Sequence, residues 1–315
     1  MKILKITFIA IVSLLLCATL ALWTPDTSPQ TMKQKYGGEP SQFVELANGD
    51  VVHYRDQGLR SGPVLVLVHG TSASLHTWEP LIEALKDQFR LISYDLPGHG
   101  LSGPTKSRDY SSVAMVQSTW NLMSHLNIDS ATLVGNSLGG SIAWRAALDD
   151  PSRVKSLVLL APSGAPRVSV AQSNIGFKIL GTPLGQALMK KITPRFIIKK
   201  SLLQTVVDPK IVDETSIDRY WELLRMQGNR QAMIDLANTP RPSDDWRRLP
   251  EIKSSALVIW GKQDGVLPSD MADTFSNGLV SANLHILDGV GHLPMEEATA
   301  EVVALIQEFC QNSGC

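Results

Sequence analysis

A serine flanked by glycines stands between an apolar run and a segment with helical spacing. Residues 134–140 read VGNSLGG, so Gly135 and Gly139 are the second neighbours of Ser137 on either side. A sharp strand-to-helix turn needs small residues at these positions, because the strand and the helix pass close to each other there. Such a turn lifts the serine hydroxyl to the amino end of a helix, where amide dipoles stabilise negative charge on a bound oxygen. The pattern predicts that Ser137 is a nucleophile.

A serine hydroxyl is a weak nucleophile at neutral pH and requires a base that an acid holds in place. His292, in the stretch GVGHLP, follows the last expected strand and precedes the last expected helix. Asp264 comes just after the expected strand 256–260, whereas the strand end at Ala161 offers no carboxylate nearby. We therefore expect Asp264 to orient His292 as the base for Ser137. Three other histidines lie in loops that could border the same site: His69, His76 and His99.

Attack by a serine on a carbonyl also requires donors for the oxyanion that forms. Thr71 follows the expected buried strand that ends at Val68, and Leu138 follows the nucleophile directly. We expect the backbone amides of Thr71 and Leu138 to supply two such donors. Three further residues are expected to line the substrate pocket: Asn136, Ser72 and Leu293.

Strands and helices alternate along the chain and should bring these groups to one edge of a sheet. An Asn-Gly turn predicts a hairpin between residues 43–46 and 51–54. Later strands are expected at 63–70, 90–94, 131–135, 154–161, 256–260 and 284–287, and helices at 78–88, 111–126, 138–148, 269–277 and 296–310. The continuous apolar strands and this alternation predict an α/β fold, with a mostly parallel sheet and helices on both faces. Ligand sites in such sheets lie at the carboxyl ends of the strands.

Residues 162–250 break this alternation, because they contain helical patches but no clear strand. We expect them to form a helical lid over a core made of residues 42–161 and 251–315. Between Arg153 and Val207 the sequence has basic and apolar residues but no Asp or Glu. Such a surface can lie on an anionic membrane. The alternative is a solvated helix face above a packed core.

The amino terminus has a different character from the rest of the chain. Lys2 and Lys5 precede an uncharged, mostly apolar run from Ile6 to Trp23. Residues 1–23 are therefore expected to be a cleaved signal peptide or a retained membrane anchor, followed by a polar tether at 24–41. In both cases the basic end stays in the cytoplasm and the rest is exported, either anchored to the membrane or secreted.

Bulk composition excludes little else. The chain has 315 residues, is 43% hydrophobic and carries a formal net charge of −1, so we expect no nucleic-acid partner. Two cysteines near the carboxyl end, Cys310 and Cys315, could form a small disulfide or remain free thiols.

Five motifs in this order resemble those of the α/β-hydrolase superfamily, over about residues 43–310. They are HGTSAS (which begins at His69), DLPGHGLS (Asp95 to Ser102), GNSLGG, WGKQD ending at Asp264, and GHLP with His292. The resemblance implies the order nucleophile, acid, base that Ser137, Asp264 and His292 follow. It implies no metal and no organic cofactor.

Two subfamilies share different features with this chain. The apolar amino terminus and the basic lid are similar to membrane-bound monoacylglycerol-lipase-like esterases. Asn136, Ser137 and a helical lid are also similar to the carbon–carbon bond hydrolases of aromatic-ring breakdown. Those enzymes usually carry a tryptophan just after the catalytic histidine, where this chain has Leu293, and they use a lid arginine, for which Arg167 and Arg195 are candidates.

The sequence therefore predicts a serine hydrolase that cleaves a small-molecule ester or lipid-like substrate with a hydrophobic acyl group. The membrane is an expected partner, through residues 6–23 and through the basic lid. A carbon–carbon bond hydrolase is the alternative. A fold that only binds a ligand is disfavoured, because Ser137, Asp264 and His292 are all present.

Overall fold

One mixed sheet organises the chain in the computed structural model, which describes residues 7, 22–166, 169, 174–240 and 244–315. Its eight strands lie in the order β1-β2-β4-β3-β5-β6-β7-β8. Their bounds are β1 Gln42–Glu45, β2 Val51–Gly58, β3 Val64–Val68, β4 Arg90–Tyr94, β5 Ala131–Asn136, β6 Val154–Leu160, β7 Ser255–Gly261 and β8 Ala282–Leu287. The pairs β1–β2 and β2–β4 are antiparallel, and every neighbouring pair from β4 to β8 is parallel. The predicted mostly parallel sheet is confirmed.

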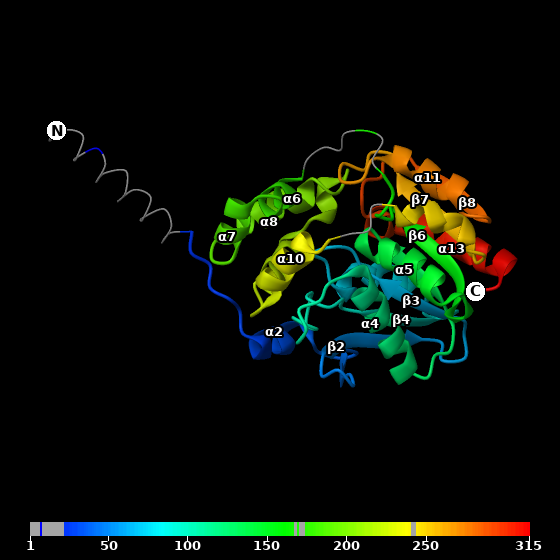
Figure 1. The fold of residues 1–315 in the computed structure, drawn as a ribbon, viewed down its shortest axis with the longest axis horizontal. Helices are drawn as coiled ribbons and strands as arrows, with labels where there is room; N and C mark the ends of the chain where they lie inside the picture. The colour runs from blue at the N-terminus through cyan, green and yellow to red at the C-terminus, as the bar shows by residue number, and fades with distance from the viewer. Residues whose placement is uncertain (1–6, 8–21, 167–168, 170–173, 241–243) are drawn as a thin grey trace.

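Helices cover both faces of this sheet because its strands are apolar on both faces (Figure 1). In β3, Leu65 and Leu67 point to one face, and Val66 and Val68 point to the other. The first face packs against α3 and α13, and the second packs against α4, α5 and α11. The bounds of these helices and of the short α12 are α3 Glu79–Leu85, α4 Ser112–His125, α5 Leu138–Asp149, α11 Ala272–Gly278, α12 Pro294–Glu297 and α13 Thr299–Ser313.

The chain between β6 and β7 forms a group of helices on one side of the sheet (Figure 1). We call it the helical insertion. Its α-helices are α6 Ile175–Leu180, α7 Pro183–Met189, α8 Arg195–Leu203, α9 Glu214–Leu224 and α10 Asn229–Asn238. Short 3-10 turns lie at η3 Pro209–Ile211 and η4 Asp245–Glu251, and elsewhere at η1 Leu75–Trp78, η2 Pro151–Arg153 and η5 Ser269–Met271.

Some of the basic side chains of the helical insertion are paired with acidic residues of the same insertion. Arg195 pairs with Asp218 at 2.6 Å and with Glu214 at 2.7 Å, and Lys199 pairs with Glu214 at 2.8 Å. Both acids belong to α9, which follows the acid-free stretch in the sequence. Exposed apolar side chains nevertheless remain on α7 and α8, where Leu184 is 71% exposed.

Residues 24–36, expected to be part of a polar tether, fold against the helical insertion. We call them the amino-terminal strap. The Thr24 amide donates to the Lys191 carbonyl at 2.9 Å, and Thr27 pairs with Met226 in an isolated parallel bridge. Asp26 accepts from the buried Arg230 at 2.6 Å.

The second half of the strap is the helix α2 (Pro29–Tyr36), which the Ser28 hydroxyl caps by accepting from the Thr31 amide at 3.0 Å. Met32 is buried against Leu101, Leu223 and Met226. The strap therefore joins the helical insertion to a loop of the core.

The structure decides between the alternatives for the two cysteines at the carboxyl end, but not between those for the amino terminus. Cys310 and Cys315 form a disulfide. The predicted signal or anchor at residues 1–23 falls almost wholly outside the described residues. Where the chain is described, no helix has the length and apolar character needed to cross a membrane.

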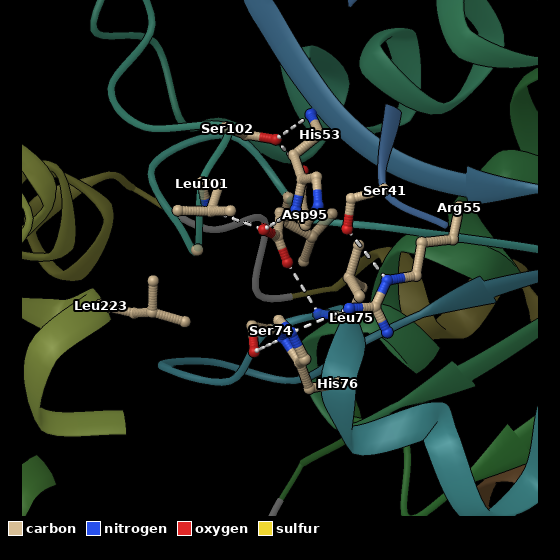
Figure 2. Close-up of polar contacts among 12 residues, drawn as sticks. Ser41, His53, Arg55, Ser74, Leu75, His76, Asp95, Leu101, Ser102 and Leu223 are labelled. Atoms are coloured by element: carbon tan, nitrogen blue, oxygen red, sulfur yellow. Dashed lines mark hydrogen bonds and ion pairs between the residues drawn. The ribbon is translucent and has the colours of Figure 1, made fainter. Parts of the chain in front are cut away.

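The carboxylate of Asp95, just after β4, is buried and binds the loops near the carboxyl end of this strand (Figure 2). It accepts from the amides of Leu75 and Leu101, both at 2.7 Å, and contacts His53 Nδ1 at 2.6 Å. Burial by itself would raise the pKa of Asp95, but the charge and hydrogen bond of His53 lower it overall. A Cβ on Gly100 would lie 2.0 Å from this carboxylate, which explains the glycine in the DLPGHGLS motif.

Two histidines beside Asp95 are buried as neutral rings. Burial lowers the pKa of His99 to about 3 and that of His76 to about 4. His76 contacts Arg55 at 3.1 Å, and the His99 Nδ1 atom lies 2.9 Å from the Pro97 carbonyl. Both rings are therefore buried, uncharged parts of the packed loops.

The strap predicts a stability effect. Replacing Asp26 with Ala leaves the buried Arg230 guanidinium without its carboxylate and should lower the free energy of unfolding by about 1–3 kcal/mol. Lys35→Ala, which removes an exposed ion pair of the same strap, should cost less than about 1 kcal/mol. Urea denaturation of the two variants measures both values, and equal costs would contradict a supporting role for Asp26.

The neutral histidines predict a pH effect on stability. Below the usual histidine pKa of about 6.5, His99 and His76 are protonated in the unfolded chain but stay neutral in the folded protein. The free energy of unfolding is therefore highest above that pH and falls as the pH is lowered. Between about pH 7 and pH 5 the loss should be about 1–2 kcal/mol for each histidine. Urea denaturation should show a smaller loss for His99→Gln than for the wild type, while the exposed His125→Gln should keep the wild-type loss. Identical pH dependence in all three proteins would reject this account.

Candidate active site

Ser137 occupies a strained turn between β5 and α5. Its backbone has φ 53° and ψ −113°, a conformation that residues with a side chain rarely adopt. A Cβ on Gly139 would lie 1.9 Å from the Val68 carbonyl oxygen, and a Cβ on Gly135 would lie 2.4 Å from the Gly139 carbonyl oxygen. Only glycine therefore fits at either position. The predicted strand-to-helix turn is present, with the serine at its apex.

His292 and Asp264 come together although 28 residues separate them. The His292 Nδ1 atom lies 2.7 Å from Asp264 Oδ2. The other carboxylate oxygen accepts from the amides of Val266 and Leu267 at 2.8 and 2.9 Å, so both oxygens of Asp264 are fixed. A proton on Nδ1 satisfies the contact with Asp264 and leaves Nε2 as a proton acceptor.

Ser137 and His292 line one cavity of about 140 Å³, and Thr71, Ser72 and Leu293 line it as well. The loop that carries Thr71 passes close to the serine, because a Cβ on the adjoining Gly70 would lie 3.1 Å from Ser137 Cβ. In this structure no hydrogen bond joins Ser137 Oγ to His292. The structure thus brings the predicted nucleophile, base and acid to the same end of the sheet.

The two predicted oxyanion donors, the amides of Thr71 and Leu138, belong to different segments beside the cavity. Thr71 lines it, while Leu138 is the first residue of α5, directly after Ser137. Neither amide donates a hydrogen bond within the described part of the protein. Both are therefore free to donate to a bound oxygen.

Asn136 has a different role from the one its sequence position suggests. We expected it to line the substrate pocket, and it does touch the cavity, but only 1% of its surface is exposed. Its side-chain amide donates to the carbonyl oxygens of Leu160 and His292, both at 3.1 Å. Asn136 therefore ties the backbone of the histidine to the turn that carries the serine. The signal in the sequence is an amide side chain at a position that must be buried, because such a group needs partners.

Ser72 also makes a contact that the sequence did not predict. Its hydroxyl lies 3.6 Å from the Met233 sulfur of α10 in the helical insertion. The three loop histidines that could have bordered the site, His69, His76 and His99, do not line the cavity. His69 instead accepts from the Leu96 amide at 3.0 Å and holds two loops of the core together.

The walls of the cavity are mostly apolar and come from the helical insertion. Their apolar residues on and beside α6, α7 and α8 are Phe177, Ile179, Leu180, Met189, Ile192, Ile197, Ile198 and Leu202. Polar groups reach the same cavity from Asn174, Thr193, Ser201, Thr205 and Tyr220. None of the described lining residues is Arg, Lys, Asp or Glu.

Of the two candidates for a lid arginine, only Arg195 lies among the described residues. Arg195 does not line the cavity and pairs with the acids of α9. Arg167 lies outside the described residues.

Known proteins are similar to this one over most of the chain. YugF of Bacillus subtilis strain 168, an uncharacterised hydrolase, is 28% identical over 84% of this chain and 95% of its own length. A 2-hydroxy-6-oxononadienedioate/2-hydroxy-6-oxononatrienedioate hydrolase of Dechloromonas aromatica strain RCB is 28% identical over 90% of this chain and 99% of its own. The solved structure of the lipase candidate Lip1 from Acinetobacter baumannii AYE superimposes with a TM-score of 0.75 and 27% identity, over 92% of this chain and 98% of that one.

A family model described as the alpha/beta hydrolase fold matches residues 63–299. The matched region is well over half of the sequence and contains Ser137, Asp264 and His292. The chain belongs to the α/β-hydrolase fold family.

Proposed function

We propose that the protein is a serine hydrolase that cleaves carboxylic esters with a hydrophobic acyl group. The observation that carries this proposal is the apolar cavity that Ser137 and the Asp264-bound His292 line together. A nucleophile, a base and an uncharged, apolar binding space meet there.

The chemistry follows from the positions of these groups. Ser137 Oγ attacks the ester carbonyl while His292 Nε2 accepts the hydroxyl proton, and Asp264 stabilises the resulting imidazolium. The amides of Thr71 and Leu138 donate to the oxyanion of the tetrahedral intermediate. His292 then protonates the leaving alcohol. A water molecule, deprotonated by the same nitrogen, releases the acid from Ser137 and restores the enzyme.

The composition of the cavity supports an acyl group without charge. Burying a carboxylate or an ammonium among these walls would carry a desolvation penalty, because the described lining residues offer no opposite charge. An alkyl chain meets apolar side chains from α6 to α8 instead. The similarity to the lipase candidate Lip1 agrees with this substrate class.

A carbon–carbon bond hydrolase is the second candidate, and the relative in Dechloromonas aromatica supports it. That relative acts on a dienedioate, whose carboxylates need cationic or strongly hydrogen-bonding partners. The described walls here supply no cation, and Leu293 follows the histidine. The ester therefore fits this cavity better.

The proposal includes export and attachment to a membrane through residues 6–23. The strap supports this location, because Thr24 meets Lys191 between α7 and α8. Exposed apolar side chains lie on these two helices, Leu184 on α7 and Phe196 on α8. Lysines on the same two helices can contact anionic lipid headgroups.

The nucleophile is tested by Ser137→Ala. This variant should lose at least about 10³-fold in kcat/KM on p-nitrophenyl esters, because the covalent route through the acyl-enzyme is closed. Ser152→Ala, at an exposed turn remote from the cavity, should keep wild-type activity. The same assays with butyrate, octanoate and a ring-fission dienoate separate the two candidate reactions. Hydrolysis of the dienoate without hydrolysis of either ester would overturn the esterase assignment.

The membrane contact is tested on a chain that begins at Leu22. Replacing Lys190, Lys191 and Lys200 with Gln should weaken its binding to anionic vesicles by about 10²-fold, since each basic residue near a surface contributes about 1 kcal/mol and about 1.4 kcal/mol corresponds to tenfold. Activity on a water-soluble ester should change little. Replacing Lys106, Lys155 and Lys253, which are exposed on the core, is the matched control. Vesicle co-sedimentation that is equal for both variants would reject the helical insertion as a membrane contact.

A further inference from the structure

The backbone on either side of His292 is held by a carboxylate outside the catalytic set. Glu297 Oε1 accepts from the Leu293 amide at 3.1 Å, and Glu297 Oε2 accepts from the Gly291 amide at 3.0 Å. The same Oε2 also accepts from the amide of Val207 at 2.7 Å. One side chain therefore joins both neighbours of the histidine to a residue of the helical insertion. Hydrogen bonds to an ionised carboxylate are stronger than those between neutral groups.

The amide of His292 itself donates to the same part of the helical insertion. It reaches the Thr205 carbonyl oxygen at 2.7 Å. This approach depends on Gly291, where a Cβ would lie 2.6 Å from that carbonyl oxygen and 2.9 Å from Glu297 Oε1. All three consecutive amides, from Gly291 to Leu293, are thus bound either by the helical insertion or by the carboxylate that also binds it.

The segment that holds the histidine also forms the substrate cavity. Thr205 lies two residues after α8 and lines the cavity, as Ser201 and Leu202 do. A displacement of α8 that admits or releases substrate would therefore move the acceptor of the His292 amide. The opposite side of the histidine is attached to the core, through Asn136 at its carbonyl and Asp264 at its ring.

We propose that Thr205, Val207 and Glu297 form a histidine clamp that couples the position of the helical insertion to the alignment of the catalytic base. When the helical insertion is docked, the clamp fixes the backbone of His292 at the cavity that it lines with Ser137. When it moves away, the backbone of His292 loses its amide acceptor, and Glu297 loses Val207. Glu297 is then a positioning residue, because it acts on the reaction only through His292. A displacement of about 1 Å at a reacting group can reduce the rate about 10²-fold.

The kinetic test uses the full chain with Glu297→Gln and Glu297→Ala, and p-nitrophenyl acetate as a substrate too short to depend on the apolar walls. We expect kcat to fall about tenfold in the first variant and about 10²-fold in the second, with KM nearly unchanged. Glu301→Gln, the same change at an exposed site of α13, should match the wild type. A carboxylate that only supported the cavity wall would instead raise KM for p-nitrophenyl octanoate and leave kcat for the acetate within about twofold. That result would overturn the clamp.

The kinetic test rests on the proposed esterase function. A second test, by hydrogen exchange, does not depend on catalysis. Hydrogen exchange followed by mass spectrometry should show faster exchange in Glu297→Gln, both at residues 289–295 and at residues 203–209. Glu301→Gln should change neither segment. Faster exchange in one segment alone, or in neither, would refute the coupling. Absence of ester hydrolysis in the wild type together with joint exchange would refute the esterase assignment and leave the clamp standing.

Discussion

The close approach of α5 to β3 is the constraint on which the site depends. Gly139 lies so near the Val68 carbonyl that no side chain fits between them, and this proximity forces the turn that holds Ser137 at φ 53°. The turn places the serine hydroxyl and the first amide of α5 side by side at the carboxyl end of the sheet. Burial of β5 on both faces stabilises the strained residue, because the flanking strand and helix cannot relax independently. The proposed nucleophile, Ser137, and one proposed oxyanion donor, the amide of Leu138, therefore both depend on one packing contact.

The proposed catalytic base, His292, is held by contacts from more than one part of the fold. Its ring is fixed by Asp264 and its carbonyl by Asn136, both from the core, but its amide is bound by Thr205 of the helical insertion. The amino-terminal strap in turn contacts both the helical insertion, where Asp26 pairs with Arg230, and the core, where Met32 packs against Leu101. The strap and the segment after β8 thus both contact the helical insertion. Under the proposed histidine clamp, substrate binding and the alignment of His292 share the same structural support.

Local patterns predicted the sheet, the turn at Ser137 and the pairing of His292 with Asp264. Each of these follows from residues within one short segment, or from the rule that parallel strands gather their carboxyl ends. The contacts that the sequence did not reveal join residues far apart. Asp26 and Arg230 are 204 positions from each other, and Val207 and Glu297 are 90 apart. The partners of two basic residues in the helical insertion were not evident for the same reason, because the acids that pair with Arg195 and Lys199 come later, on α9. Asn136 lies beside the cavity, and one of its hydrogen-bond partners, the carbonyl of His292, belongs to a loop that only the tertiary fold brings near.

The central claim is that Ser137 is the nucleophile of a working hydrolase, and covalent labelling tests it most directly. A fluorophosphonate reacts with a serine only where a base activates the hydroxyl and donors stabilise the phosphonyl oxygen. Incubation of the folded protein, followed by peptide mass spectrometry, should find the adduct on Ser137 at one equivalent per chain. Prior unfolding should abolish the labelling. A folded protein that remains unlabelled, or that carries the adduct on another residue, would contradict the account.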